Sequence, residues 1–251
     1  VALMDDPALV PALKAAFGAA ELAGCTTAGE IGQTGVTDAH LVITALHFDA
    51  PGFSVAVTDQ KGMDDSRGAG ARLATMLQQP GLHNVLVLGQ GVSINGSALI
   101  EGLQAGLPAG VVLSGGLAGD GGSFSRTLTL SGRGVSATQT VAIGFSAPNT
   151  LFNHGCFHGW KPFGPSRRVT RSQGNVLYEL DGQSALEIYK RYLGEHAAGL
   201  PASGLLFPFE MLGEDQNAVG LIRTILAVDE ASGSLTLAGD IVENGYLRLM
   251  H

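Results

Sequence analysis

Short apolar runs alternate with glycine-rich turns along this chain, and the pattern predicts an α/β fold. Three runs are compact and rich in branched side chains, which is typical of buried strands: 41–48, 84–88 and 110–114. In other segments apolar residues recur every three or four positions and predict helices: 6–23, 66–79 and 96–103. The run 52–58 is predicted to pair with 41–48 as a hairpin.

A strand, a helix and a second strand in succession predict a right-handed parallel crossover between residues 84 and 114. Each strand leads into a glycine-rich loop, Gly89–Gly96 after the first and Gly115–Gly122 after the second. Both loops would then emerge at the same edge of the sheet, where open α/β sheets bind ligands. The first loop lacks the spacing of a Rossmann or Walker motif, so it is weak evidence for phosphate binding.

The remainder of the chain is predicted to be rich in strands. A hairpin is expected to pair 126–131 with 138–146, and Pro148-Asn149 then has the character of a boundary. We therefore expect mixed sheets in two domains, 1–150 and 151–251. The second domain is predicted to hold one helix and five strands: the helix 184–193 and the strands 167–171, 176–180, 220–228, 234–237 and 245–250.

Composition narrows the classes of function. The 251 residues are 45% hydrophobic and 14% charged, which suffices for a sizeable core. The net charge of −8 argues against a partner that is nucleic acid or an anionic membrane surface. No apolar run is long enough for membrane insertion, and no segment has the pattern of a secretory signal. Two cysteines are too few for a disulfide framework, so we expect a cytoplasmic protein.

The run Gly24–Gly32 concentrates polar groups between glycines, namely Cys25, Thr26, Thr27 and Glu30. A thiol, two hydroxyls and a carboxylate in one loop are typical of a binding site held between packed elements. A structural interpretation is equally available, because Thr27 as a helix N-cap and Glu30 three residues later fit a capping box. The local sequence leaves both interpretations open.

Several runs together resemble the FIST domain family. Gly24–Ile31 resembles that family's Gly-Cys-(Ser/Thr)-(Ser/Thr)-x-Gly-Glu-Ile signature, and Gly115–Asp120 resembles its Gly-Gly-x-Ala-Gly-Asp run. Later runs resemble the domain junction and the opening of the C-terminal part: Gly159–Pro165, Tyr178–Leu186, Phe207-Pro208, Ile222-Arg223, Gly233–Leu235 and Leu247–Met250. The order is kept, and the matches extend over nearly the whole chain.

The resemblance implies a bacterial sensory module that binds a small ligand such as an amino acid. It also implies a signalling partner, such as a histidine kinase, a cyclic-di-nucleotide enzyme or a chemoreceptor. The sequence departs from the family in two respects. The family usually has a hydrophobic strand before the first helix, and it continues past the Leu-Met run, so we expect the second domain to be incomplete.

Catalysis is not predicted. The chain contains no G-x-S-x-G, H-E-x-x-H or C-x-x-C motif, and an inert, buried Cys25 is favoured over a nucleophilic one. Binding of a small polar ligand fits the convergent loops better. The expected ligand-binding residues are Cys25, Thr26, Thr27, Glu30, Ser114, Gly115, Gly116, Asp120, Trp160 and Arg223.

A second hypothesis starts from His154, Cys156 and His158, which alternate in one short run beside Trp160. Heme needs one axial His or Cys and an apolar pocket. A subset of the FIST family binds heme and senses nitric oxide, so the resemblance implies a heme-binding nitric-oxide sensor as the alternative. Other histidines are also possible ligands, namely His83 and His196. The structural interpretation of the run is a set of surface histidines at the domain junction.

Overall fold

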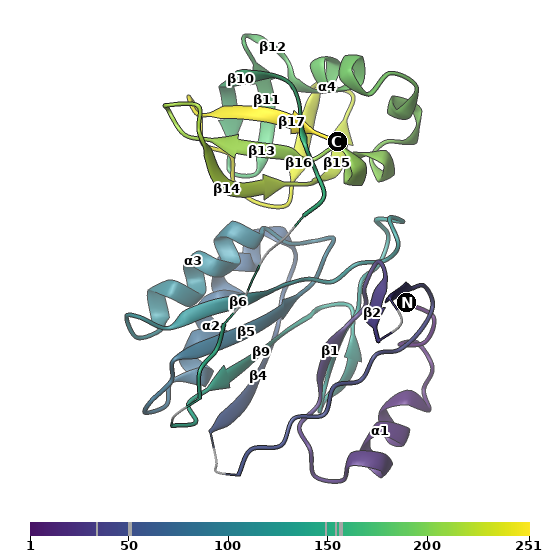
Figure 1. The fold of residues 1–251 in the computed structure, drawn as a ribbon, viewed down its shortest axis with the longest axis vertical. Helices are drawn as coiled ribbons and strands as arrows, with labels where there is room; N and C mark the ends of the chain where they lie inside the picture. Colours follow the sequence, from purple (N-terminus) through teal and green to yellow (C-terminus); the bar gives the residue numbers. More distant parts are fainter. Residues whose placement is uncertain (34, 50–51, 149, 154, 156–157) are drawn as a thin grey trace. The chain divides into compact units, whose positions relative to one another are not determined.

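The computed structural model describes every residue of the chain except 34, 50–51, 149, 154 and 156–157. The chain divides into two compact units, Val1–Gly155 and Cys156–His251, which are described separately here. Each unit combines helices with β-sheet (Figure 1). The predicted α/β class with mixed sheets in two domains is confirmed.

The first unit is built on a four-stranded sheet. Its strands lie in the order β4 (Phe53–Asp59), β9 (Gln139–Phe145), β5 (Asn84–Gly89) and β6 (Val112–Leu117). β5 and β6 are parallel, and the other pairs are antiparallel. Helix α3 (Gly96–Gly106) connects the parallel strands, so the predicted crossover unit is confirmed.

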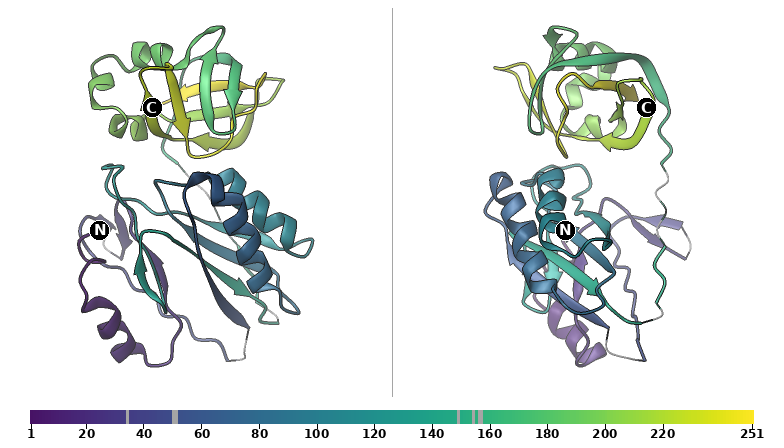
Figure 2. Two further views of the ribbon diagram at one scale, coloured as in Figure 1. Left: turned by 180° about the vertical axis from the view of Figure 1, so that it is seen from behind. Right: turned by 90° about the vertical axis from the view of Figure 1, so that its left-hand side faces the viewer.

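Two helices cover one face of this sheet, as both views of Figure 2 show. Helix α2 (Ser66–Leu77) follows the short 3₁₀ helix η1 (Met63–Asp65) and packs against α3. The two helices approach closely because each has a glycine where they meet, Gly70 in α2 and Gly102 in α3. Their buried side chains form one core with the strands: Ala56, Ala69, Leu73, Ala74, Leu77, Leu82, Val85, Val87, Ile94, Leu99, Leu103 and Ala142.

Shorter elements complete the first unit: α1 (Leu9–Phe17), the sheet β1 (Ala23–Cys25), β7 (Thr129–Ser131) and β8 (Gly134–Ser136), and the hairpin β2 (Glu30–Gly32) with β3 (Gly35–Thr37). The helix predicted over 6–23 ends at Phe17 because Gly18 adopts a φ of 59°. β7 pairs with β8 and not with 138–146 as expected. That later run is β9, which enters the central sheet instead.

The run Leu41–Phe48 is extended but is not a strand, so this prediction was wrong. Its expected partner β4 pairs with β9 instead. Within the described part of the chain, no residue bonds to the backbone of Leu41–Phe48. A strand requires a neighbour that supplies hydrogen bonds, and an apolar pattern alone does not identify that neighbour.

The second unit contains an eight-stranded sheet and helix α4 (Ala185–Leu193), which begins at the predicted N-cap Ser184. Seven strands follow the order β14, β13, β17, β10, β11, β16, β15, and β12 pairs with β11. The run predicted as one strand over 220–228 is divided between β14 and β15. The bounds are β10 Pro162–Gln173, β11 Val176–Leu180, β12 Gln183–Ser184, β13 Phe209–Leu212, β14 Ala218–Arg223, β15 Ile225–Asp229, β16 Ser234–Leu237 and β17 Tyr246–Met250.

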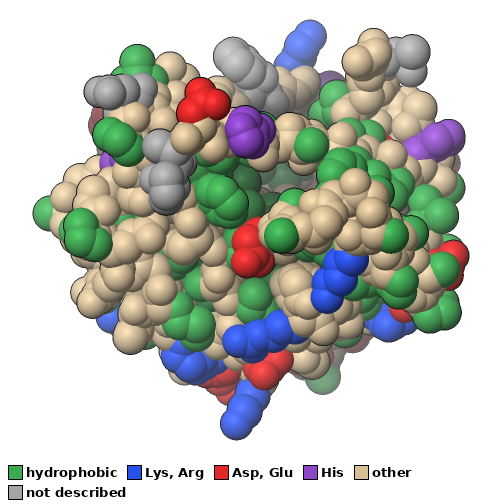
Figure 3. Space-filling view, turned by 90° about the horizontal axis from the view of Figure 1, so that it is seen from below, with side chains coloured by type: hydrophobic (Ala, Val, Ile, Leu, Met, Phe, Trp, Pro, Cys, Tyr) green, Lys and Arg blue, Asp and Glu red, His purple; other side chains and the backbone are tan. Residues whose placement is uncertain are grey.

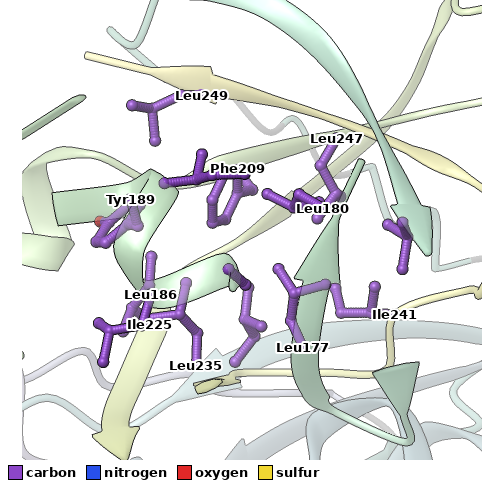
Figure 4. Packing of buried hydrophobic residues seen from close by; sticks show 14 of the residues in the cluster. Leu177, Leu180, Leu186, Tyr189, Phe209, Ile225, Leu235, Ile241, Leu247 and Leu249 are labelled. Atoms are coloured by element: carbon purple, nitrogen blue, oxygen red, sulfur yellow. The ribbon is translucent and has the colours of Figure 1, made fainter. Parts of the chain in front are cut away.

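The core of the second unit lies between α4 and these strands. Leu186 and Tyr189 of α4 pack among strand residues such as Leu177, Ile225 and Leu235 (Figure 4). Tyr189 is fully buried, and its hydroxyl donates a hydrogen bond to the carbonyl of Phe207 at 2.7 Å. Two 3₁₀ helices follow α4 in this unit: η2 Gly194–Gly199 and η3 Ala202–Leu206.

Candidate functional site

Three glycine-rich loops meet at the carboxyl ends of β5 and β6. The amide of Ala118 donates to the carbonyl of Gly89, and the amide of Gly119 donates to the carbonyl of Thr26, both at 2.9 Å. The amide of Gly91 donates to the hydroxyl of Thr127 at 2.9 Å. The structure therefore brings the loop that follows each parallel strand against the Gly24–Gly32 run, as the predicted crossover requires.

These loops pack too tightly to leave a ligand pocket between them. A Cβ atom on Gly91 would overlap the carbonyl oxygen of Ala118, and one on Gly119 would lie 2.7 Å from the amide nitrogen of Ala28. The backbone donors of Ala118, Gly119 and Gly91 are already used. The meeting point of the loops thus serves mainly to hold the chain together.

Thr26 belongs to this structural set. Its side chain is buried, and its hydroxyl bonds both the amide nitrogen of Leu128, at 3.0 Å, and the carbonyl oxygen, at 3.4 Å. Each of these bonds fastens the end of β1 to the segment that precedes β7. A buried hydroxyl with both partners in the protein has little left to offer a ligand.

Thr27 and Glu30 interact directly. The Thr27 hydroxyl donates to the Glu30 carboxylate at 2.7 Å, and the amide of His40 donates to the same carboxylate at 3.2 Å. The hydrogen bond from Thr27, followed by that from His40, lowers the pKa of Glu30. The capping box is wrong, because Glu30 begins strand β2 and no helix follows. The two residues instead tie the base of the β2–β3 hairpin together.

Asp120 organises the loop that follows β6. Its carboxylate accepts hydrogen bonds from the amides of Phe124, Ser125 and Arg126 at 3.1, 2.8 and 3.1 Å. Burial acts to raise the pKa of Asp120, but these backbone donors outweigh it, and the pKa is lowered. The carboxylate is therefore engaged in the turn, and its role is positional.

Replacement of Asp120 by Asn tests this role. The amide group of Asn presents an NH₂ where an oxygen now accepts, so we expect Asp120→Asn to lower the free energy of unfolding by about 1 kcal/mol at neutral pH. Because the pKa is lowered on folding, the loss is present above the ordinary pKa of Asp, about 3.9. It disappears as the pH falls through the lower folded value. Urea denaturation at pH 7 and below pH 3 measures it, and an equal loss at both would contradict the assignment.

Ser114, Gly115 and Gly116 lie on strand β6, and not partly in the loop after it as predicted. The strand continues because Gly115 and Gly116 stand in parallel register with Val87 and Leu88 of β5. Gly115 has a φ of 136°, and a Cβ there would overlap the backbone of Val87. The hydroxyl of Ser114 contacts only the carbonyl of Val85, at 3.5 Å. These residues support the sheet edge.

Trp160 and Arg223 belong to the second unit, so the structure does not bring them into the loop cluster of the first. Trp160 is half-buried, with its ring 5.7 Å from that of His158. The guanidinium of Arg223 donates from Nε to the carbonyl of Asp240 at 3.2 Å, and burial lowers its pKa. Their inclusion in one site with Cys25 stays a prediction.

The heme candidates are described only in part. His154 and Cys156 lie outside the described residues, while His158 is exposed beside Trp160. His83 packs against Phe152, with 5.4 Å between their ring centroids. In the described part of the chain, no three His, Cys, Asp or Glu side chains gather in a way that would hold a metal ion. Heme binding stays a prediction, and nothing below is built on it.

The first unit contains a cavity of about 500 Å³, which we call the α1 cavity. Its wall comes from α1, β1, the extended run Leu41–Phe48, β4 and β9. Figure 3 shows a hollow on the face seen from below, with hydrophobic side chains around it and an acidic side chain at its edge. The wall is mainly apolar, with residues such as Leu13, Val55 and Ile143.

Cys25 connects this cavity with the signature run, because it lies in β1 and also lines the cavity. The thiol is partly buried, and burial raises its pKa, which keeps it protonated at neutral pH. Among the described residues Cys25 has no disulfide partner. It therefore offers the cavity a small, soft and uncharged contact.

Most of the cavity wall was missed by sequence reasoning. The residues come from segments more than a hundred positions apart, so no local motif unites them. One signal was present: β4 and β9 carry apolar residues on both faces, with Ala56 and Ala142 toward the helices and Val55 and Ile143 on the other side. A strand that is apolar on both faces predicts that both are covered.

The comparisons with known proteins agree with the resemblance described above. The FIST N domain model matches residues 2–183, and the FIST C domain model matches residues 185–251. These models divide near residue 184 and the compact units divide after Gly155, so the boundary expected at residue 150 stays a prediction.

One curated relative is the uncharacterized protein MJ1623 of Methanocaldococcus jannaschii, which is 31% identical over 86 residues. The match covers 34% of this chain and 17% of that protein, so the chain spans a small part of the relative's length. No solved structure matches the chain. In the described part, no helix has the length and apolar character that a membrane crossing demands. Because the two family models together cover nearly every residue, the chain belongs to the FIST family of sensory signal-transduction domains.

Proposed function

We propose that this chain is the sensing part of a signalling protein and that its first unit binds a small ligand in the α1 cavity. The observation that carries the proposal is the cavity itself. Its volume of about 500 Å³ falls within the range of small-molecule sites, which are concave and mainly apolar with a few polar groups. Its polar groups include the Cys25 thiol and the Glu21 carboxylate.

This site differs from the polar cluster expected from the sequence. Thr26, Thr27, Glu30 and Asp120 use their side chains to hold loops together. A ligand with an apolar body and one polar end fits the α1 cavity better than a fully polar metabolite. An amino acid with an apolar side chain is the simplest member of that class.

The elements around the cavity are suited to report its occupancy. Helix α1 contains no buried residue, and the side chains of Leu41–His47 are exposed. Segments with few buried apolar contacts open at low free-energy cost, and sensors draw their moving parts from such segments. A ligand that contacts α1 and Leu41–Phe48 together would order both. We propose that this ordering is passed to a partner such as a histidine kinase, a cyclic-di-nucleotide enzyme or a chemoreceptor.

Thermal-shift screening tests the proposal. The library contains the twenty amino acids, together with small apolar amines and carboxylic acids. A ligand that binds only the native state at 100 times its Kd stabilises it by about 2.7 kcal/mol, so a true hit raises the melting temperature in proportion to the logarithm of its concentration. Hydrogen exchange of the hit complex should show slower exchange in α1 and Leu41–Phe48. If protection instead appeared only in the second unit, the assignment to the α1 cavity would be wrong.

A further inference from the structure

The wall of the α1 cavity includes a stretch of backbone that is ready to pair. Eight consecutive residues, Leu41–Phe48, have no hydrogen bond from or to their backbone within the described part of the chain. All eight line the cavity. At the rise of a strand, eight residues extend over roughly 26 Å. A compact ligand would leave most of these amide and carbonyl groups without a partner.

Two neighbouring strands also leave an edge unpaired. β1 and β4 each stand at the end of their sheet among the described strands, and both contribute residues to the cavity wall. An apolar segment with free backbone groups, flanked by edge strands, is a template for an added strand. Main-chain hydrogen bonds would then supply affinity, and apolar side chains would enter the cavity.

The charge of the wall indicates how such a strand would be oriented. The described wall contains one carboxylate, that of Glu21, and no Lys or Arg. Glu21 is exposed and has no hydrogen-bond or ion-pair partner in the described part of the chain. Lys14, from the neighbouring helix, bonds the carbonyl of Gly132 at 3.2 Å. A positively charged amino terminus complements this wall, and a free carboxylate does not.

We propose that the natural ligand of the α1 cavity is a short apolar peptide, added as a β-strand along Leu41–Phe48 with its amino terminus at Glu21. This inference rests on the proposed function, because it names the ligand class of the same cavity. Recognition of main-chain groups explains why the segment is extended and apolar yet unpaired. It also explains why the one carboxylate of the wall has no partner.

Peptide titration tests the proposal. The probe is the tetrapeptide Leu-Val-Leu-Val with a free amino terminus and an amidated carboxyl end. Its first control carries methyl groups on the backbone nitrogens, which removes the donors but keeps the side chains. Its second control is acetylated at the amino terminus, which removes the charge. Calorimetry should show that the probe binds and that backbone methylation weakens binding by about tenfold or more.

Two protein variants locate the contacts. Ala45→Pro removes one backbone donor from the segment without breaking a hydrogen bond of the described chain, and Ala45→Val is its matched control. We expect Ala45→Pro to weaken the probe by about tenfold and Ala45→Val to leave it within about twofold. Glu21→Gln should weaken the free-amino probe severalfold and leave the acetylated peptide unchanged. Thermal denaturation of each variant confirms that it folds.

The outcomes separate this inference from the proposed function. If the methylated peptide bound as tightly as the probe, strand addition would be refuted while the cavity remained a ligand site. The same holds if library compounds bound the cavity and no peptide did. Equal effects of Glu21→Gln on free and acetylated peptides would refute the orientation. A dimer seen by sedimentation, dissociated by Ala45→Pro and unaffected by peptide, would mean that a second copy pairs with Leu41–Phe48 instead.

Discussion

Val55→Trp is expected to abolish ligand binding to the first unit while leaving that unit folded. Val55 lies on β4 and faces the α1 cavity, and it is only half-buried. An indole at this position would fill the space that a ligand occupies, and the open side of the cavity gives it room. We expect the affinity of a confirmed ligand to fall by about 100-fold or more, which removes its thermal shift.

Val112→Trp is the matched control for this experiment. Val112 is 46% exposed at the start of β6 and is not part of the cavity wall. The same substitution there adds the same surface and should leave ligand affinity unchanged. The melting temperatures of the two unliganded variants should lie within about 3 °C of the parent protein. A Val55→Trp protein that bound the ligand normally would place the site elsewhere.

Gly70→Ala is expected to give the largest loss of stability of any single methyl group added to this chain. The new Cβ would overlap the carbonyl oxygen of Leu99 and lie 2.8 Å from the amide nitrogen of Leu103, both in the backbone of α3. Backbone does not move aside as a side chain does, so α2 and α3 would have to separate. The cost of about 3 kcal/mol exceeds the gain of about 1 kcal/mol that Ala brings to a helix.

Gly68→Ala provides the comparison within the same helix. Its Cβ would meet the ends of the Asp65 and Arg72 side chains, at 2.7 and 3.0 Å, and those ends can move. We expect Gly68→Ala to change the free energy of unfolding by less than about 1 kcal/mol. Chemical denaturation followed by a probe in the first unit distinguishes the two. Equal stabilities for Gly68→Ala and Gly70→Ala would mean that α2 and α3 are not in backbone contact.

Where local signals agreed with pairing, the sequence predicted the fold well. The apolar runs around Val85 and Val111, with a helix between them, have few arrangements open to them other than a parallel crossover. Ser184 and the apolar spacing of α4 likewise specify a capped helix that needs no distant information. In both cases the residues that determine the element lie next to one another.

The failures concern features that depend on distant partners. Leu41–Phe48 has the composition of a strand, but whether it becomes one is decided by a neighbour that its own residues do not specify. The roles of Thr26 and Asp120 are similar, since both have the chemistry of a ligand site and both are occupied by backbone groups. A sequence shows which polar groups a loop contains, but not which of them are already satisfied.

The α1 cavity is the extreme case, because its wall joins α1 to β9 across more than a hundred residues. The apolar positions of α1 were expected to be buried against the unit, yet the helix contains no buried residue. An amphipathic helix that stays exposed beside a cavity is a sign that something else completes its packing. That sign is visible only after the rest of the fold is known.

The most direct test of the central claim is the reactivity of Cys25, whose thiol lies on the wall of the α1 cavity. The protein is treated with iodoacetamide with and without a saturating ligand from the screen, and modification of each cysteine is followed by peptide mass spectrometry. Cys156, the other cysteine of the chain, serves as the internal reference. The account predicts that the ligand slows modification of Cys25 by about tenfold or more relative to Cys156. Unchanged modification of Cys25 at saturating ligand would contradict the claim that the ligand occupies this cavity.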